Sequence, residues 1–274
     1  MSPLLPISGL LVGFSLGLTG GGGAIFAVPL LVYMLDVPAR EAVGVSLITV
    51  GTTALVGFVQ RARRGQVEFP TGLLFALAGM FGAPIGSWIA DRMAESLLLG
   101  LFTLLMLAIA VRMWRKANQP KAQLPVLSPA ELDENDGPTC RRDPQGKLRI
   151  TSPCALLLAA IGVSTGVLTG LFGVGGGFII VPALVMFSGM GMQRAVGTSL
   201  LVITFVSISG TASFLLGGRE LSPTVVAGFT AGSIVGLFAG TWLSQRLAGP
   251  TLQKTFAAAI LVVAMYVVGR TVWG

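Results

Sequence analysis

Long apolar runs divide this 274-residue chain into predicted membrane-spanning segments. A helix rises about 1.5 Å per residue, so about 20 apolar residues are needed to cross a hydrocarbon core about 30 Å thick. The runs that approach this length are 42–59, 70–90, 95–111, 153–171, 195–217, 223–243 and 251–269. Hydrophobic residues make up 53% of the chain and charged residues only 11%, which lies outside the range of soluble domains. The pattern therefore predicts an all-α polytopic membrane protein.

Shorter apolar segments lie beside two glycine-rich stretches. Residues 5–18 and 22–35 flank the first stretch, and 178–188 follow the second. These segments are too short to cross a bilayer comfortably. Residues 153–171 precede the second stretch and form its entering arm. We interpret the two segments that flank each stretch as a helical hairpin broken at its glycines. Secondary transporters use such interrupted helices to build a site near the membrane midplane.

The two glycine-rich stretches mark an internal repeat, in which residue 17 matches residue 170. Gly17-Leu18-Thr19-Gly20-Gly21-Gly22-Gly23 is matched by Gly170-Leu171-Phe172-Gly173-Val174-Gly175-Gly176-Gly177. Val-Pro follows each stretch, at Pro29 and Pro182, and then Ala-Val-Gly-x-Ser-Leu, which contains Ser46 and Ser199. A polar, proline-containing linker separates the copies. The sequence thus predicts a first membrane repeat at 1–116, a linker at 117–152 and a second membrane repeat at 153–274.

The number of crossings in each repeat predicts how the repeats are related. Each is expected to hold one glycine-rich broken-helix hairpin, whose two ends emerge on the same side of the membrane, and three transmembrane helices. Each repeat therefore crosses the membrane an odd number of times, so the two repeats are inverted. Under this topology most Lys and Arg residues fall on the side of the linker. Because cytoplasmic loops carry an excess of basic residues, the linker is expected in the cytoplasm and both termini outside.

Inversion would bring the two glycine tips together from opposite faces of the membrane. Glycine permits φ > 0 and leaves backbone N–H groups open to a ligand, and the start of the helix after each tip carries partial positive charge. Such helix starts bind anions without Lys or Arg. The predicted substrate-binding glycines are Gly20, Gly21, Gly22, Gly23, Gly173, Gly175, Gly176 and Gly177. Glycines also allow close helix packing, the role we assign to Gly9, Gly13 and Gly17.

Hydroxyl side chains and prolines complete the predicted site. Thr19, Ser46 and Ser199 are candidates to donate hydrogen bonds to the anion. The alternative for each hydroxyl is a bond to the carbonyl four residues earlier in its own helix. Pro29 and Pro182 interrupt the backbone hydrogen bonds of short helices, and we interpret them as hinges.

Several kinds of chemistry find no support in the sequence. The chain has no histidine, and its acidic residues fall at the ends of the predicted spans or in the linker, so we expect no metal site, no cofactor and no enzymatic activity. The net charge of +7 is explained by topology, without nucleic acid as a partner. Cys140 and Cys154 lack framework spacing and are expected to be free thiols. The expected partners are the lipid bilayer and a small anionic substrate, and a homo-oligomer is left open.

The paired Gly-x-x-Gly-x-Gly-Gly stretches, each followed by Val-Pro and Ala-Val-Gly-x-Ser-Leu, resemble the sulfite exporter TauE/SafE family, the toluene sulfonate uptake permeases. The resemblance covers nearly the whole chain except the linker. It implies a secondary transporter of small sulfur-containing oxyanions, such as sulfite, sulfoacetate or related organosulfonates, in the cell inner membrane. A passive anion channel of the same architecture and a membrane scaffold without transport activity are the alternatives.

The inverted arrangement predicts a labelling pattern. Cysteines introduced singly as Arg64→Cys and Arg219→Cys should react with a membrane-impermeant thiol reagent from opposite faces, because an odd number of crossings separates the two positions. The measurement uses vesicles of both orientations. Labelling of both cysteines from the same face would contradict the inverted repeat.

Overall fold

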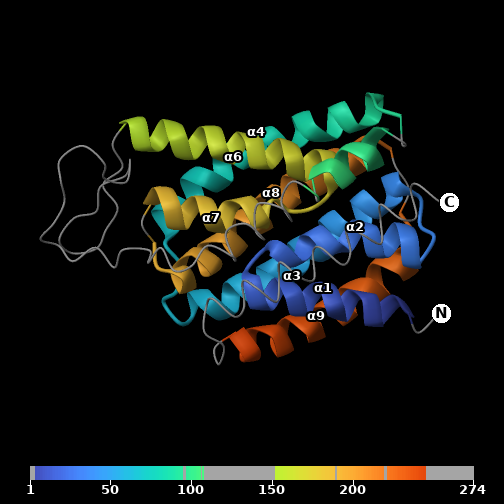
Figure 1. Cartoon of the computed structure of the whole chain (residues 1–274), viewed down its shortest axis with the longest axis horizontal. Coiled ribbons are helices and arrows are strands. Elements are labelled where there is room, and N and C mark those ends of the chain that lie inside the picture. Colours follow the sequence, from blue (N-terminus) through green and yellow to red (C-terminus); the bar gives the residue numbers. More distant parts are fainter. Residues whose placement is uncertain are drawn as a thin grey trace, which may run out of the picture.

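The computed structural model describes residues 4–94, 97–105, 107, 152–188, 190–218 and 221–244. All regular structure in these ranges is helical, and the helices lie side by side in one bundle (Figure 1). The labelled elements are α1 (Leu4–Thr19), the 3₁₀ turn η1 (Gly22–Phe26), α2 (Ala27–Pro29), the π turn η2 (Leu30–Met34), α3 (Ala39–Ala62), α4 (Phe69–Arg92), α6 (Ser152–Phe172), α7 (Gly177–Ser188), α8 (Met192–Leu216) and α9 (Pro223–Ser244). Residues 97–105 are also helical.

Five of these helices, α3, α4, α6, α8 and α9, are long and apolar enough to cross a membrane. They confirm as helices the apolar runs predicted at 42–59, 70–90, 153–171, 195–217 and 223–243. The entering arm of the second hairpin is one of the five, whereas α1, its counterpart in the first, is shorter. The linker, the predicted span at 251–269 and the end of the run at 95–111 lie outside the described residues.

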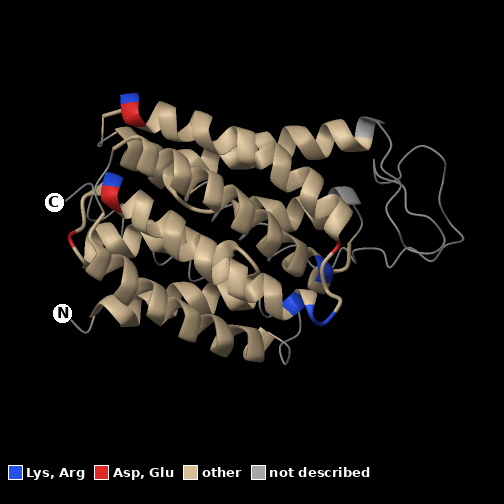
Figure 2. Cartoon of the chain, turned by 180° about the vertical axis from the view of Figure 1, so that it is seen from behind, with Lys and Arg blue, Asp and Glu red and all other residues tan. Residues whose placement is uncertain are grey.

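Charged side chains gather at the two ends of the bundle, and over the ranges described above its middle carries none (Figure 2). Large apolar side chains cover the outside of that middle region. Phe81 is 75% exposed and Val235 60% exposed. A band of exposed apolar surface between two charged ends is what a bilayer requires, because side chains that face lipid need no polar partner.

The helices of the two repeats exchange packing partners. α1 packs along α9, and α6 packs along α4, so the entering helix of each repeat lies against a helix of the other repeat. At the centre α3 packs against α8. Gly44, near the start of α3, faces the Phe214 ring near the end of α8, and Gly57, near the end of α3, faces Leu200, near the start of α8. These two matched helices therefore run antiparallel.

Glycines allow the exchanged helices to approach to backbone contact. Gly13 of α1 lies so close to the Ser233 carbonyl of α9 that a Cβ atom would overlap it. Gly166 of α6 lies in the same way against the Gly79 carbonyl of α4. Gly9 and Gly17 also face α9 backbone atoms, so the predicted packing role of the α1 glycines is confirmed.

Hydrogen bonds between side chains add to the contact of α3 with α9. The Thr49 and Thr230 hydroxyls lie 2.9 Å apart, and the Thr53 hydroxyl donates to the Ser233 hydroxyl at 3.0 Å. In a bilayer such bonds between helices stabilise association, because lipid offers the hydroxyls no partner.

The first returning arm differs from the expected regular helix. It begins as a 3₁₀ turn at Gly22, continues as a three-residue α turn that ends at Pro29, and finishes as the π turn η2. Proline has no N–H, so a regular ladder of i→i−4 bonds is interrupted at Pro29. In the second arm Pro182 lies inside α7, which stays α-helical from Gly177 to Ser188.

One expectation about the cysteines is wrong. Cys154, at the start of α6, is disulfide-bonded and is therefore no free thiol. Two isolated cysteines carry no framework spacing, and whether they pair depends on the distance at which the fold places them. Cys140 lies outside the described residues.

The backbone contact between α1 and α9 predicts a stability effect. Gly13→Ala should lower the free energy of unfolding by about 1–3 kcal/mol, because the added methyl group overlaps the Ser233 carbonyl and forces the helices apart. Thermal unfolding of the purified protein in detergent measures the change. Gly100→Ala is the matched control, since Gly100 is helical and a Cβ there meets nothing within 4 Å. Equal unfolding temperatures for the two variants would contradict the packing role of Gly13.

Candidate functional site

Each broken hairpin reverses direction through glycines with positive φ. In the first tip Gly20 has φ 75° and Gly21 has φ 156°; in the second, Gly173, Gly175 and Gly176 have φ 68°, 66° and 61°. Side chains with a Cβ atom rarely adopt these conformations, so glycine is required for the turn itself. The end of the entering helix is the same in both tips: the Gly20 amide donates to the Leu16 carbonyl and the Gly173 amide to the Thr169 carbonyl, each at 2.8 Å.

The two tips touch each other. A Cβ atom on Gly21 would lie 2.5 Å from the Cα atom of Gly177, so the chains meet backbone to backbone. Gly175 faces Val50, near the middle of α3, and Ile203, near the middle of α8. The predicted approach of the tips is therefore confirmed, and they meet where the central helices cross. The contact leaves no room for a ligand between Gly21 and Gly177 in this conformation.

Matched serines bind each tip to the other half of the molecule. The Ser46 hydroxyl of α3 donates to the Gly173 carbonyl in the second tip, and the Ser199 hydroxyl of α8 donates to the Gly20 carbonyl in the first, both at 2.6 Å. Both side chains are fully buried. In this conformation the hydroxyl hydrogens of Ser46 and Ser199, predicted to donate to an anion, are therefore used by tip carbonyls.

Thr19, the other predicted hydroxyl donor, stabilises the first tip. It donates to the Ser15 carbonyl at 2.8 Å and accepts a hydrogen bond from the Gly22 amide at 3.0 Å. The bond to Ser15 is the local alternative that the sequence left open. The bond from Gly22 satisfies one of the N–H groups at the start of η1, as a helix-capping side chain does.

The second tip presents N–H groups without acceptors. Within the described ranges the N–H groups of Gly175, Gly176 and Gly177 donate no hydrogen bond, whereas the Gly176 carbonyl accepts from Ile179 and Ile180, and all three residues are buried. Successive backbone N–H groups of this kind, at a helix start, form a concavity that favours an anion. The first tip has less of this capacity, because Gly22 is capped by Thr19.

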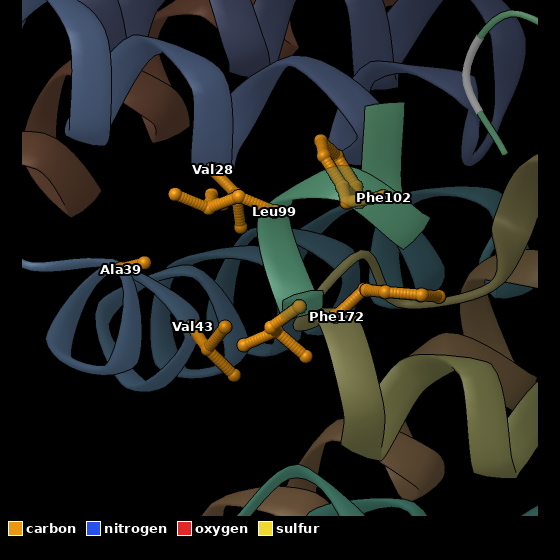
Figure 3. Close-up of a pocket in the computed structure, with 7 residues that line it drawn as sticks. Val28, Ala39, Val43, Leu99, Phe102 and Phe172 are labelled. Carbon is orange, nitrogen blue, oxygen red and sulfur yellow. The ribbon is translucent and has the colours of Figure 1, made fainter. Parts of the chain in front are cut away.

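An apolar pocket lies beside the second tip. It is small, with a volume of about 10 Å³, and is lined by Val28, Ala39, Val43, Leu98, Leu99, Phe102 and Phe172 (Figure 3). The rings of Phe102 and Phe172 lie 5.5 Å apart between centroids. No polar side chain lines this space, so an anion would find no hydrogen-bond donor among its side chains. We therefore assign the candidate site to the tips and not to this pocket.

Arg61, in the last turn of α3, has a structural position that the sequence did not suggest. Only 3% of its surface is exposed, and its Nη1 donates to Oε1 of Gln193 at 3.1 Å and to Oε1 of Gln66 at 3.4 Å. In the sequence it belongs to a basic run at a span end, which the positive-inside rule explained without any further role. The repeat offered a signal, because the position in α8 that matches Arg61 is the buried Phe214.

No group of three or more His, Cys, Asp or Glu residues that could hold a metal ion is found in the described part of the chain. The candidate site consists instead of backbone groups, with hydroxyls and one guanidinium around them.

Comparisons with known proteins place the chain among transporters. A family model described as "Sulfite exporter TauE/SafE" matches residues 5–267. A "Probable membrane transporter protein" of Xylella fastidiosa (strain Temecula1) is 34% identical over 268 residues, which is 96% of this chain and 94% of the relative. "Probable membrane transporter protein YdhB" of Bacillus subtilis (strain 168) is 28% identical over 233 residues, 82% of this chain and 85% of the relative. No solved structure matches the chain.

The crossed serine bonds predict a stability effect of matched size in the two repeats. Ser46→Ala and Ser199→Ala should each lower the free energy of unfolding by about 1–3 kcal/mol, because each leaves a buried tip carbonyl without its donor. Thermal unfolding in detergent measures both. Ser164→Ala is the control, since that exposed hydroxyl bonds only within its own helix. If both tip variants unfolded like the control, the serines would not hold the tips.

Proposed function

Because the chain belongs to the sulfite exporter TauE/SafE family, a family of membrane transporters, we propose that it is a secondary transporter of small sulfur-containing oxyanions such as sulfite, sulfoacetate or related organosulfonates. The observation that carries the proposal is the meeting of two glycine tips, of which the second has three consecutive amide groups without acceptors. These donors suit the oxygen atoms of an anion.

The proposed architecture is a pair of inverted repeats. It is supported by the antiparallel course of the matched helices α3 and α8 and by the exchange of partners between α1, α9, α4 and α6. In this arrangement one tip enters from each face of the membrane. Alternating access then requires that one set of helices move against the other around the tips.

The serines have two roles in the proposed cycle. In the closed form described above, their hydroxyl groups bind tip carbonyls and hold the tips together. When the tips separate, oxygen atoms of the substrate replace the Gly173 and Gly20 carbonyls as acceptors of the same hydrogen atoms. Thr19 and the tip glycines complete the substrate-binding set. Pro29 and Pro182, where backbone bonds are missing, act as the hinges on which the returning arms move.

We place the linker in the cytoplasm and the termini outside, in the cell inner membrane. The support is the basic end of the bundle, where Arg61, Arg63 and Arg64 lie (Figure 2). The disulfide bond of Cys154 at the linker end of α6 argues for the opposite orientation, because disulfides are typical of oxidising compartments. Labelling of Arg64→Cys from one face decides between the two arguments.

Transport of sulfur oxyanions is tested by flux into proteoliposomes. Labelled sulfite, thiosulfate and an organosulfonate should enter with saturable kinetics and show counterflow, because a carrier with touching tips must change conformation to release its substrate. Gly21→Ala and Gly177→Ala should lose most of this flux, since each added methyl group overlaps the opposite tip. Gly100→Ala should keep it, because a Cβ there meets nothing within 4 Å.

Four outcomes would contradict the proposal. Flux that neither saturates nor shows counterflow would indicate a channel, and full flux in both tip variants would remove the tips from the site. A protein that moves none of the anions would be a scaffold or a transporter of another substrate. Calorimetry with sulfite, challenged by an organic cation, tests the sign of the charge: displacement of sulfite by the cation would overturn the assignment of an anion.

A further inference from the structure

Arg61 is a buried cation, and among the residues that the structure describes no carboxylate forms an ion pair with it. Its two hydrogen-bonded neighbours, Gln66 and Gln193, contribute neutral amide oxygens, and its nearest charged influence is another cation, Arg64. Its Nε atom is buried, and within the described ranges it has no hydrogen-bond partner. A charge removed from water at this depth is costly unless it is paired or serves a ligand.

The position of Arg61 connects it to the first glycine tip. Gln193, which accepts its hydrogen bond, lies in the first turn of α8. Further along α8, Val196 packs against Gly20, and Ser199 donates to the Gly20 carbonyl. Six residues of α-helix correspond to about 9 Å, so Gln193, which accepts from Arg61, lies about 9 Å along α8 from the serine that binds the first tip.

We propose that Arg61 binds the transported oxyanion at this end of the molecule, before it reaches the tips. A guanidinium presents Nε and Nη donors in one plane, a geometry that matches two oxygen atoms of a sulfite or sulfonate group. Gln66 and Gln193 hold Nη1 and so fix the plane of the group. The exposed Arg64 adds positive potential that attracts anions from solution. This inference rests on the proposed function and adds to it a residue that binds substrate.

The proposed site exists in one repeat only. The residue that matches Arg61 is Phe214, which is 1% exposed and packs against Gly44. The two faces of the transporter should therefore differ in apparent affinity for the same anion. This asymmetry separates a substrate-binding arginine from a residue that merely stabilises the fold, because a general loss of stability would affect transport from both faces.

The test measures sulfite flux into proteoliposomes from each face. Arg61→Gln should raise the KM about tenfold on the face that carries Arg61, while KM on the other face and the maximal rate stay nearly unchanged. Arg61→Lys should give an intermediate KM, since it keeps the charge but loses the planar pair of donors. The matched control is Arg63→Gln, two residues away and exposed, which should change KM by less than about twofold.

A second variant tests whether Arg61 serves only to hold α8. Gln193→Ala removes one acceptor of Nη1 and leaves the charge and the bond to Gln66, so KM should rise by less than the increase expected for Arg61→Gln. If Gln193→Ala raised KM as much as Arg61→Gln, the hydrogen bond and not the charge would matter, and the inference would be overturned. If Arg61→Gln aggregated on size-exclusion chromatography, Arg61→Lys with Gln193→Ala would decide the question on the same criteria.

Three further results would overturn the inference. The first is an unchanged KM in Arg61→Gln while the unaltered protein transports sulfite, which leaves the proposed function standing. The second is an equal rise of KM on both faces. The third result would show that Arg61 binds a lipid phosphate and not the transported anion. In that case, adding phosphatidylglycerol to phosphatidylcholine vesicles would raise the KM of the unaltered protein to that of Arg61→Gln, because the headgroup would occupy Arg61. Absence of sulfite flux in the unaltered protein would overturn the proposed function together with this inference.

Discussion

Two crossed hydrogen bonds, from Ser46 to the Gly173 carbonyl and from Ser199 to the Gly20 carbonyl, hold the centre of this protein together. Unwound backbone inside a bilayer exposes carbonyl groups that lipid cannot satisfy, so another part of the protein must donate to them. Here each half of the molecule supplies the donor for the other. The unwinding that makes a glycine tip available to a ligand is therefore tolerated only when both halves are assembled.

The same dependence appears in the packing of the outer helices. α1 has its backbone contact with α9, and α6 has its contact with α4. There is no hydrophobic driving force between helices in lipid, so close van der Waals contact and hydrogen bonds must provide the association. Glycines such as Gly13 and Gly166 provide that contact by bringing backbones together. Neither repeat can form these interfaces from its own helices, because each interface joins one helix of the first repeat to one helix of the second.

The two halves form matched hydrogen bonds between serines and tips, but they carry different side chains at two matched positions. Thr19 caps the first tip, whereas Phe172 at the matched position faces an apolar pocket with Phe102. Arg61 is buried in α3, and Phe214 takes its place in α8. A transporter with two chemically identical halves would handle its substrate equally from both faces. Under the proposed function, these differences predict that the two faces bind and release the substrate differently.

The apolar runs determined the helices, because in a bilayer the length of an apolar segment decides whether it crosses. The repeat also predicted, without any structure, which residues form the tips and which glycines pack α1. Sequence could not predict the 3₁₀ and π turns around Pro29 or the disulfide bond of Cys154, since local bond patterns and cysteine pairing depend on how the fold places distant segments. The sequence also did not decide whether the serine hydroxyls bind an anion or a backbone carbonyl.

Position in the assembled bundle decided those points. A hydroxyl in a membrane helix commonly bonds to a carbonyl of its own helix, and Ser199 has such a partner in Val196. The closer partner of Ser199 and the partner of Ser46 lie in the opposite repeat. Arg61 is an ordinary span-end arginine in the sequence, and only the packing of α8 and of the turn after α3 buries it. The sequence by itself determined which segments enter the membrane and where they break. The tertiary structure alone decided which hydroxyls hold the broken ends, because each serine and the tip carbonyl that it binds lie far apart in the chain.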